Sequence, residues 1–551
     1  MRAPRALGGI ALLFVALALG CGRSPRDARG PVILVSIDTL PADRVGCYGY
    51  PSARTPLLDR LARRGLQVRD LISPAPLTLP SHATMLTGVD PPVHGLRDNG
   101  LYRLSPTTPT LAELLPKDLP KAGFIGGFPL YRTFGLGRGF DVWDDSGLAE
   151  AGAIRHPQRR AADVLKSARA WLELRARDSS PFVFAQLYDP HYPYEAPARW
   201  PAAARAAGGD EYDAEVAYVD AQLVRFTAWV DETFQRRAVY LVTADHGEAL
   251  GSHGEPTHSN FVYDATQRVP CALEGPGAPR RIDPRQRRLA DVAATVLDLY
   301  GVSPGGRATS LIREGEDSPA YVETLHTKLF KGWSALYGAR TPQWKYIRAP
   351  RSELYDLLED PGETRNLLAE RPDVGRELSA FVDSALAGAE DHPAAGLSDD
   401  VRARLAALGY VATAPVAADS TPSMKDPKDG IAGTAALFRG EQAFLRGDLA
   451  KAEEELLSAL AADPSLKDAH AYLAGVYLRT KRFDLAALHG ETALQLDPHV
   501  NETPMHATLG EAYLDLGRSP DALRHLEIAA AASPKDARLA SLLQRARASR
   551  R

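Results

Sequence analysis

Three apolar runs that each end at an aspartate constrain the fold more than any other feature of this sequence. The runs cover residues 31–37, 181–188 and 239–244, and they lead into Asp38, Asp189 and Asp245. Continuous β-rich runs of this kind are typical of strands covered on both faces in a parallel sheet. Helical apolar stripes over 161–176 and 212–234 alternate with them. This alternation predicts an α/β sandwich with a largely parallel sheet.

Polar side chains that follow the strands form the first candidate site. Open α/β sheets bind their ligands at the carboxyl ends of the strands, which makes Asp38 and Asp245 candidate metal ligands. In isolation, an N-cap of the next turn would be the better explanation of Asp38. Three histidines accompany the carboxylates, namely His191, His246 and His258. This combination favours a metal-assisted ester-cleaving site.

A hydroxyl at a helix start is the second candidate feature. Within residues 75–88, Pro76 and Pro80 fix an extended approach, and residues 81–86 can form one short helix that ends at Gly88. Thr78 then lies at a helix N-terminus, where backbone N–H groups and the helix dipole favour an anion. The alternative is an ordinary helix with a threonine cap.

Ordered sequence blocks resemble the sulfatase branch of the alkaline phosphatase superfamily. The resemblance covers roughly residues 31–368, and its blocks are 35–40, 78–82 with 86–88, 189–191, 243–248 with 263–264 and 268–270, and 345–347 with 353–357 and 360–361. The resemblance implies an alkaline-phosphatase-like α/β/α sandwich. The last block is similar to the small C-terminal subdomain of that branch.

The nucleophile block departs from the sulfatase pattern. Sulfatases begin it with a cysteine that is oxidised to formylglycine, followed by proline, a small residue and arginine. The corresponding residues here are Thr78, Pro80, Ser81 and His82. A threonine cannot release sulfate by re-forming an aldehyde, and it is what phosphodiesterases and phosphoethanolamine or phosphoglycerol transferases of the superfamily use.

Two further positions depart in the same direction. Thr39 stands where sulfatases have a second acidic residue, and the later lysine region has His258 and Ser259. Taken with Thr78, these changes favour phosphate esters over sulfate esters.

The resemblance also implies a ligand set for one divalent cation. Asp38, Thr78, Asp245 and His246 would hold it, and mixed carboxylate and imidazole ligation favours zinc or manganese, with calcium as a further option. A second metal would need Asp189, His191 and His258 together, and the tight spacing of Asp189 and His191 favours a single ion.

Catalytic and substrate-binding roles follow from the same resemblance. Thr78 would attack phosphorus, while Asn99 would either bind a non-bridging oxygen or close its own loop as an Asx turn. His191 and His258 would bind the anionic oxygens and could protonate the leaving oxygen. His253 would be either a further ligand or a solvated loop residue.

The N-terminal residues indicate export. Arginines precede an apolar run over 7–19 that is too short for a comfortable membrane span and has the layout of a secretory signal. The run ends at Cys21, as in bacterial lipoprotein signals, which predicts a signal peptide over 1–21, lipidation of Cys21 and a tether over 22–30. A signal that is simply cleaved, or left uncleaved, is the alternative. The prediction places the protein in the bacterial periplasm or cell envelope, anchored to the membrane.

Charge and cysteine content exclude other classes. A formal net charge of −4 with scattered basic residues argues against a nucleic-acid-binding protein. Three cysteines are too few for a disulfide framework, and Cys47 and Cys271 could pair only if the fold brings them close.

An internal repeat dominates the second half. After a catalytic domain over 31–388 and a polar linker over 389–430, a period of about 34 to 35 residues runs through 431–547. Its marker residues are Gly440, Gly475 and Gly510, Ala452, Ala487 and Ala522, and Pro464, Pro498 and Pro534. The pattern resembles tetratricopeptide repeats, an all-α solenoid whose concave face would bind a protein or peptide partner.

Two classes of function are compatible with these observations. The first is an extracytoplasmic metal-dependent hydrolase or transferase that acts on phosphate mono- or diesters through Thr78, with a sulfuric ester hydrolase as the alternative chemistry. The second is a non-catalytic interaction protein with a decayed enzyme domain. The residues that the resemblance assigns to the site are all present at their expected positions, Thr78 among them, and this favours the enzyme.

Overall fold

The computed structural model describes residues 30–148, 158–175, 180–235, 237–306, 308–389, 424–498, 500, 502–534 and 536–549. The predicted signal peptide, Cys21 and most of the predicted linker lie outside the described residues. Among the described helices, none combines the length and the apolar character that crossing a membrane requires.

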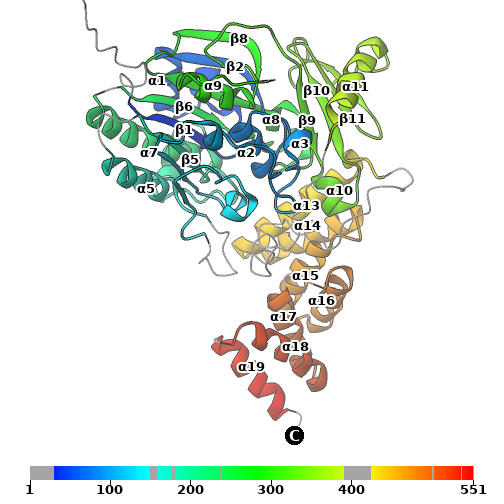
Figure 1. Ribbon diagram of the computed structural model, residues 1–551. Helices are drawn as coiled ribbons and strands as arrows, with labels where there is room; N and C mark the ends of the chain where they lie inside the picture. The colour runs from blue at the N-terminus through cyan, green and yellow to red at the C-terminus, as the bar shows by residue number, and fades with distance from the viewer. Residues whose placement is uncertain are drawn as a thin grey trace, which may run out of the picture.

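An eight-stranded sheet forms the centre of the N-terminal half (Figure 1). Its strand order is β4-β3-β5-β1-β6-β7-β2-β8. Only β7 runs antiparallel to its neighbours β6 and β2, so the sheet is largely parallel, as predicted. The strands are β1 (Val32–Ile37), β2 (Leu66–Ile72), β3 (Lys121–Phe124), β4 (Val142–Asp144), β5 (Phe182–Leu187), β6 (Val239–Ala244), β7 (Arg268–Glu274) and β8 (Arg281–Arg288).

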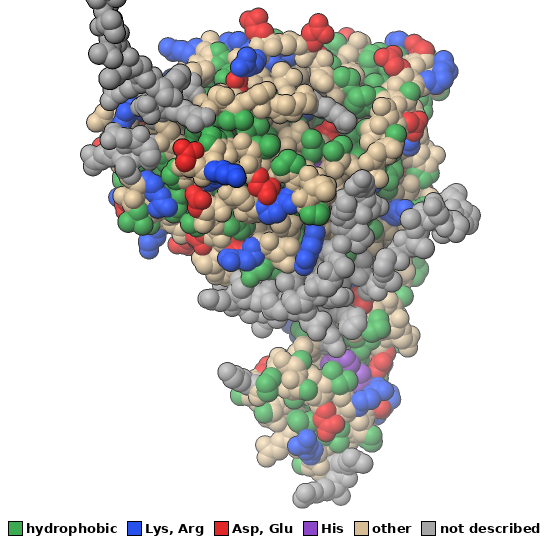
Figure 2. Space-filling model, in the orientation of Figure 1, with side chains coloured by type: hydrophobic (Ala, Val, Ile, Leu, Met, Phe, Trp, Pro, Cys, Tyr) green, Lys and Arg blue, Asp and Glu red, His purple; other side chains and the backbone are tan. Residues whose placement is uncertain are grey.

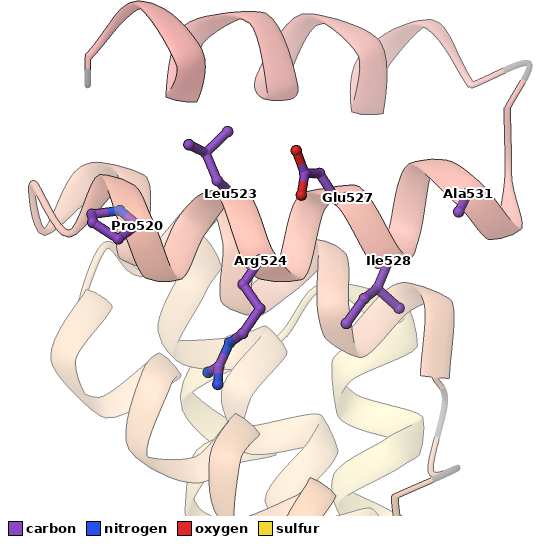
Figure 3. Close-up of a pocket in the computed structure, with 6 residues that line it drawn as sticks. All are labelled: Pro520, Leu523, Arg524, Glu527, Ile528 and Ala531. Atoms are coloured by element: carbon purple, nitrogen blue, oxygen red, sulfur yellow. The ribbon is translucent and has the colours of Figure 1, made fainter. Parts of the chain in front are cut away.

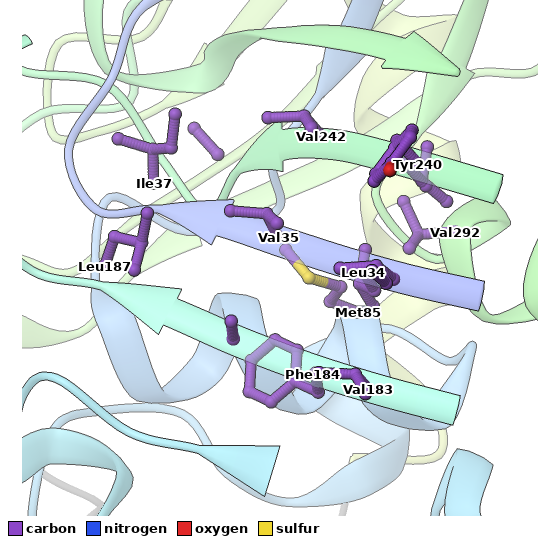
Figure 4. Close-up of a cluster of buried hydrophobic side chains, with 14 of the residues drawn as sticks. Leu34, Val35, Ile37, Met85, Val183, Phe184, Leu187, Tyr240, Val242 and Val292 are labelled. Carbon is purple, nitrogen blue, oxygen red and sulfur yellow. The ribbon is translucent and has the colours of Figure 1, made fainter. Parts of the chain in front are cut away.

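The three strands expected from the apolar runs are β1, β5 and β6, and they lie side by side at the centre of the sheet. Their register pairs Ile37 with Leu187 and with Ala244. Figure 4 shows β1 between β5 and β6, with Met85 of α2 packed beside Leu34 and Val35. The carboxyl ends of the three strands therefore meet at one edge.

The helices of this half fall into two groups that pack among themselves, as the outer layers of an α/β/α sandwich do. One group is α1, α5 and α7, and the other is α2, α4 and α9. The helices are α1 (Pro56–Arg64), α2 (Thr78–Thr87), α3 (Pro91–His94), α4 (Leu111–Leu114), α5 (Ala161–Glu173), α6 (Arg199–Ala206), α7 (Glu211–Thr233), α8 (Asp264–Gln267), α9 (Asp291–Leu299), α10 (His326–Lys331) and α11 (Pro372–Leu386).

A second, antiparallel sheet in the order β12-β11-β10-β9 completes the N-terminal half and carries α11. Its strands are β9 (Ala320–Thr324), β10 (Leu336–Arg340), β11 (Trp344–Arg348) and β12 (Glu353–Asp356). The small C-terminal subdomain implied by the sequence is this sheet.

Helical pairs form the repeat region and extend from the second sheet to the C-terminus (Figure 1). They are α13 (Pro427–Arg446), α14 (Leu449–Ala462), α15 (Lys467–Arg479), α16 (Phe483–Leu496), α17 (Glu502–Asp515), α18 (Ser519–Ala532) and α19 (Ala537–Ala548). The repeated glycines allow close helix packing, since a Cβ at Gly440 or Gly510 would lie 2.7 or 2.5 Å from the Cγ of Leu456 or Leu526. Charges of both signs are interspersed on the face shown in Figure 2.

The predicted linker over 389–430 needs correction at its end. Helix α13 already begins at Pro427, and Gly430 packs against Trp333 of the N-terminal half. At Gly430 a side chain has no room, because a Cβ there would lie 2.1 Å from the Trp333 ring.

A buried ion pair joins the second sheet to the loop that carries Asn99. Arg97 Nε and Nη2 donate to the Glu323 carboxylate of β9 at 3.1 and 2.5 Å, and Tyr321 also donates to it at 2.6 Å. Arg97 and Glu323 are 6% and 0% exposed. The loop is therefore fixed by this charge pairing together with the buried Leu96.

Replacing only Arg97 should destabilise the fold. Arg97→Met leaves the Glu323 carboxylate buried without its cation, which costs about 3–5 kcal/mol. Urea unfolding followed by tryptophan fluorescence measures the loss. The double variant Arg97→Met with Glu323→Gln removes both charges and should recover most of it. A single variant as stable as the double variant would contradict this account.

Candidate active site

Two buried carboxylates meet at the carboxyl edge of the sheet. Asp38 follows β1 and Asp245 follows β6, directly after the paired residues Ile37 and Ala244. The backbone N–H of Thr39 donates to Asp245 Oδ1 at 3.2 Å. One ligand atom each from Asp38, Asp245 and His246 lie within 4.8 Å of one another, and all three residues are fully buried.

These three side chains keep unused lone pairs in the same place. Asp38 Oδ1, Asp245 Oδ2 and His246 Nε2 are buried and have no hydrogen-bond partner. Their other atoms are fixed: Gln186 donates to Asp38 Oδ2 at 2.7 Å, and the His246 backbone donates to Asp245 Oδ1 at 2.8 Å. His246 Nδ1 donates to the carbonyl of Gly247 at 2.9 Å, which leaves a lone pair on Nε2. This donor set fits a divalent cation.

Electrostatics also favour a cation at this position. Burial and the neighbouring Asp245 raise the pKa of Asp38 well above its usual value, and burial raises the pKa of Asp245. Burial and the nearby His258 lower the pKa of His246 to about 3, so the imidazole is neutral. Two buried carboxylates without a counter-charge are costly, and a bound cation would remove that cost.

Thr78 is the first residue of α2, which ends at Gly88 in a left-handed conformation, as predicted. Its Oγ1 is buried and has no hydrogen-bond partner. His82 Nδ1 donates to the Thr78 carbonyl at 2.7 Å and lies 3.4 Å from Asp245 Oδ2. The start of α2 is therefore adjacent to the carboxylate cluster.

His82 is neutral and links the start of α2 to β1 through its two ring nitrogens. Burial lowers its pKa, and its Nε2 lies 2.9 Å from Ser36 Oγ. Since Nδ1 donates to the Thr78 carbonyl, Nε2 accepts from the serine hydroxyl. The residue that stands at the sulfatase arginine position thus brings no positive charge.

Asn99 is held next to Thr78. Its Oδ1 accepts the backbone N–H of Leu79 at 2.8 Å, so the amide binds the first turn of α2 instead of closing its own loop. Its Nδ2 is buried without a hydrogen-bond partner. An anionic oxygen bound near Thr78 could accept a hydrogen bond from this group.

Three histidines form a contiguous cluster beside the carboxylates. The ring centroids of His191 and His258 are 5.2 Å apart, and those of His246 and His258 are 4.7 Å apart. His191 Nδ1 lies 2.7 Å from the Tyr192 carbonyl, and His258 Nδ1 lies 2.9 Å from Glu248 Oε1. The structure therefore brings all the sequence-predicted histidines of the site together.

Glu248 sets the tautomer of His258. Burial raises the pKa of Glu248 to about 8 and lowers that of His258 to about 4. Near neutral pH the pair therefore keeps one proton between Glu248 Oε1 and His258 Nδ1, which lie 2.9 Å apart. His258 Nε2 then carries the ring hydrogen and can donate to a bound oxygen.

Several other candidate residues lie apart from the cluster. Asp189 accepts the Ala161 N–H at the start of α5 at 2.6 Å and is 3.4 Å from Arg160, so it is not available for a second metal. His253 stacks on Tyr263 at 3.6 Å. Cys47 and Cys271 are free thiols. Within the part of the chain that the structure describes, only the Asp38 cluster has the geometry of a metal site.

Sequence reasoning assigned no role to several residues that support the site. Gln186 and Glu248 orient Asp38 and His258, and a glutamine inside an otherwise apolar strand was an available signal. Lys331 is bonded to Asn260, beside the His258 loop, at 2.6 Å. It belongs to no motif, and nothing in the sequence links it to this loop.

A groove on the repeat region is unrelated to this site. It has a volume of 670 Å³ and is lined by residues of α18 alone (Figure 3). Leu523 and Glu527 line it together with Arg524. It contains none of the carboxylates, histidines or hydroxyls described above.

The architecture is that of an alkaline-phosphatase-like α/β fold. The sulfatase family model matches residues 31–302, and a tetratricopeptide repeat model matches residues 481–546. The chain therefore carries a sulfatase-type domain over residues 31–302 and tetratricopeptide repeats near its C-terminus, as the sequence predicted.

Individual relatives are mostly sulfatases. Delta 4,5-hexuronate-2-O-sulfatase of Bacteroides thetaiotaomicron is 22% identical over 476 residues, which is 71% of this chain and 96% of that protein. Steryl-sulfatase of Mus musculus is 34% identical over 145 residues, which is 26% of this chain and 22% of that protein.

Among solved structures, a phosphonate monoester hydrolase of Agrobacterium radiobacter has a TM-score of 0.55 at 19% identity, covering 65% of this chain and 96% of its own. A second solved structure, of a protein in complex with its substrate D-glucosamine-2-N,6-O-disulfate, has a TM-score of 0.56 at 21% identity. The match covers 67% of this chain and 100% of that one. These similarities establish the fold.

Removing one ligand should abolish metal binding. Elemental analysis of the dialysed full-length protein should give one divalent ion per chain, and Asp245→Asn should hold none because a carboxylate charge is lost. A chelator should lower the melting temperature of the wild type and leave that of the variant unchanged. His253→Gln is the matched control and should retain the ion. Metal retained by Asp245→Asn would place the site elsewhere.

Proposed function

We propose that this protein hydrolyses or transfers phosphate esters with Thr78 as the nucleophile. The observation that carries the proposal is the Thr78 Oγ1, which is buried at the start of α2 without a hydrogen-bond partner, beside the Asp38 and Asp245 carboxylates. The positive end of the helix dipole at the same position favours a bound anion.

Residue chemistry favours phosphate over sulfate. The formylglycine route of sulfatases needs a cysteine, and Thr78 cannot form an aldehyde hydrate. The neutral His82 stands where sulfatases have arginine, and His258 occupies their lysine region. The fold similarity to a phosphonate monoester hydrolase is compatible with phosphorus chemistry.

In the proposed reaction, Thr78 loses its hydroxyl proton to solvent and attacks phosphorus in line. A bond from Thr78 Oγ1 to phosphorus forms as the bond to the leaving oxygen breaks, which gives a phosphothreonine. His258 Nε2–H gives its proton to the leaving oxygen while the Glu248 proton passes to His258 Nδ1, so the imidazole stays neutral, and Asn99 Nδ2 donates to a non-bridging oxygen. Water, or an acceptor alcohol, then releases the phosphoryl group and restores Thr78.

Asp38, Thr78, Asp245 and His246 are the proposed ligands of one divalent cation. When bound, it lowers the pKa of the threonine hydroxyl and neutralises charge on the transferred group. Two carboxylates, an imidazole and a hydroxyl favour zinc or manganese, with calcium as a further option.

Sulfate-ester hydrolysis is the second candidate, because the named relatives are mostly sulfatases. The assembled site supports an enzyme over a decayed domain, since Asn99 Nδ2 and Thr78 Oγ1 are kept buried without partners. Such groups are costly to retain in a site that binds nothing.

Changing the nucleophile should separate these possibilities. Thr78→Ala should lower turnover of an aryl phosphodiester by about 10³-fold or more, because no covalent intermediate can form. Thr78→Ser, which keeps a hydroxyl, should retain partial activity. Mass spectrometry of the quenched wild type should find a phosphoryl adduct on the peptide that contains Thr78.

Comparing three substrates decides between phosphate-ester and sulfate-ester chemistry. Parallel assays use an aryl phosphodiester, an aryl phosphomonoester and an aryl sulfate. Sulfate-ester turnover without an adduct would replace the phosphoryl proposal with the sulfatase alternative. No turnover of any ester by metal-loaded protein would favour an interaction protein.

We also propose an extracytoplasmic location, with the chain anchored through Cys21 and the repeats binding a protein or peptide partner. The support is the sequence of residues 1–21 and the tetratricopeptide repeat match. Expression in a bacterial host with a palmitate analogue should label the wild type and leave Cys21→Ser unlabelled. An unlabelled wild type would contradict the anchor.

A further inference from the structure

The first helix of the repeat region presents one polar and aromatic stripe to the enzyme domain. Thr434, Phe438 and Gln442 of α13 are spaced four residues apart and therefore share one face of the helix. Each of them contacts a residue of the N-terminal half. Thr434 contacts Lys331, and the other two contact Tyr192. The contacts lead to two loops that carry site histidines.

The loop of His191 is held by two residues of this stripe. Gln442 Nε2 donates to the hydroxyl of Tyr192 at 2.5 Å. The Phe438 ring packs against the Tyr192 ring with a centroid distance of 5.0 Å. Tyr192 directly follows His191, and its carbonyl oxygen lies 2.7 Å from His191 Nδ1. A shift of Tyr192 would therefore turn the imidazole.

The loop of His258 is held through Lys331. Lys331 Nζ donates to Thr434 Oγ1 at 3.0 Å and to Asn260 Oδ1 at 2.6 Å. Asn260 in turn donates to Glu255 Oε1 from its backbone and side chain, at 2.6 and 2.8 Å. Ser259, between His258 and Asn260, has a φ of +90°. This conformation is strained for a residue with a side chain and persists only where surrounding contacts hold the loop.

Other contacts anchor α13 independently of this stripe. Arg351 pairs with Asp429 at 2.8 Å, and Lys428 pairs with Glu353. On the opposite side, Gly440 packs against Leu456 of α14. Substitutions at residues 434, 438 and 442 can therefore change the two loops while the helix stays attached.

We propose that α13 holds two active-site loops in place, and that Thr434, Phe438 and Gln442 are positioning residues for His191 and His258. The inference rests on the proposed function for its catalytic consequence. The repeat region is then part of the enzyme, in addition to any partner that its concave face binds.

Leaving-group dependence tests the catalytic consequence. If α13 positions a proton donor, its variants should harm esters of poor leaving groups most, because those need protonation. For Thr434→Val, which acts on the His258 loop, kcat for a phenyl phosphodiester should fall by about tenfold or more, and kcat for the 4-nitrophenyl analogue by far less. Thr434→Ser keeps the hydroxyl and should restore the wild-type ratio.

Leu445→Ala is the matched control on the same helix, because Leu445 is 64% exposed. Metal content should be unchanged in every variant. Equal losses on both esters would mean general destabilisation and would overturn the positioning role.

Hydrogen exchange tests the positioning without any need for turnover. Peptides covering 188–194 and 255–260 should exchange faster in Thr434→Val or Phe438→Ala than in the wild type or Leu445→Ala. Unchanged exchange in both peptides would overturn the inference. A wild type inactive on every ester would overturn the proposed function alone, since the exchange result stands by itself.

Discussion

The mutual burial of Asp38 and Asp245 is the constraint on which the site depends. Parallel pairing of β1 and β6 in the observed register places the two carboxylates close together, although their negative charges repel each other. The protein satisfies one oxygen of each with a hydrogen bond and leaves the other facing the partner acid. A proton or a counter-charge relieves such an arrangement, and the three unpaired donor atoms at this edge fit a divalent cation.

Sequence reasoning worked where local pattern and sheet geometry coincide. The runs that became β1, β5 and β6 are long and apolar, and a parallel sheet brings their carboxyl ends together whatever the loops do. The same reasoning located Thr78, because a proline-bounded helix fixes its own first turn. It missed β3 and β4 within a Gly/Pro-rich stretch, since both are short and gain their strand character from pairing with β5 and with each other.

The supporting contacts lay beyond the sequence for a different reason. Arg97 and Glu323 pair across 226 positions, and Lys331 reaches Asn260 across 71. No periodicity or motif links such residues, because only the tertiary fold brings them together. Asp189 is the opposite case. Its position after a strand predicted a site residue, but its carboxylate accepts hydrogen bonds from the Ala161 N–H at the start of α5 and from Arg160.

Helix α13 shows why the boundary between the two domains was hard to place. A helix buried on one side has one apolar stripe, whereas α13 packs against α14 with one face and against the enzyme domain with another. Its enzyme-facing positions hold a hydroxyl, an aromatic ring and an amide, because they meet Lys331 and Tyr192 rather than an apolar core. These three positions lie within the predicted repeat region, whose repeat pattern predicts packing between helices and gives no signal for an interface with the enzyme domain.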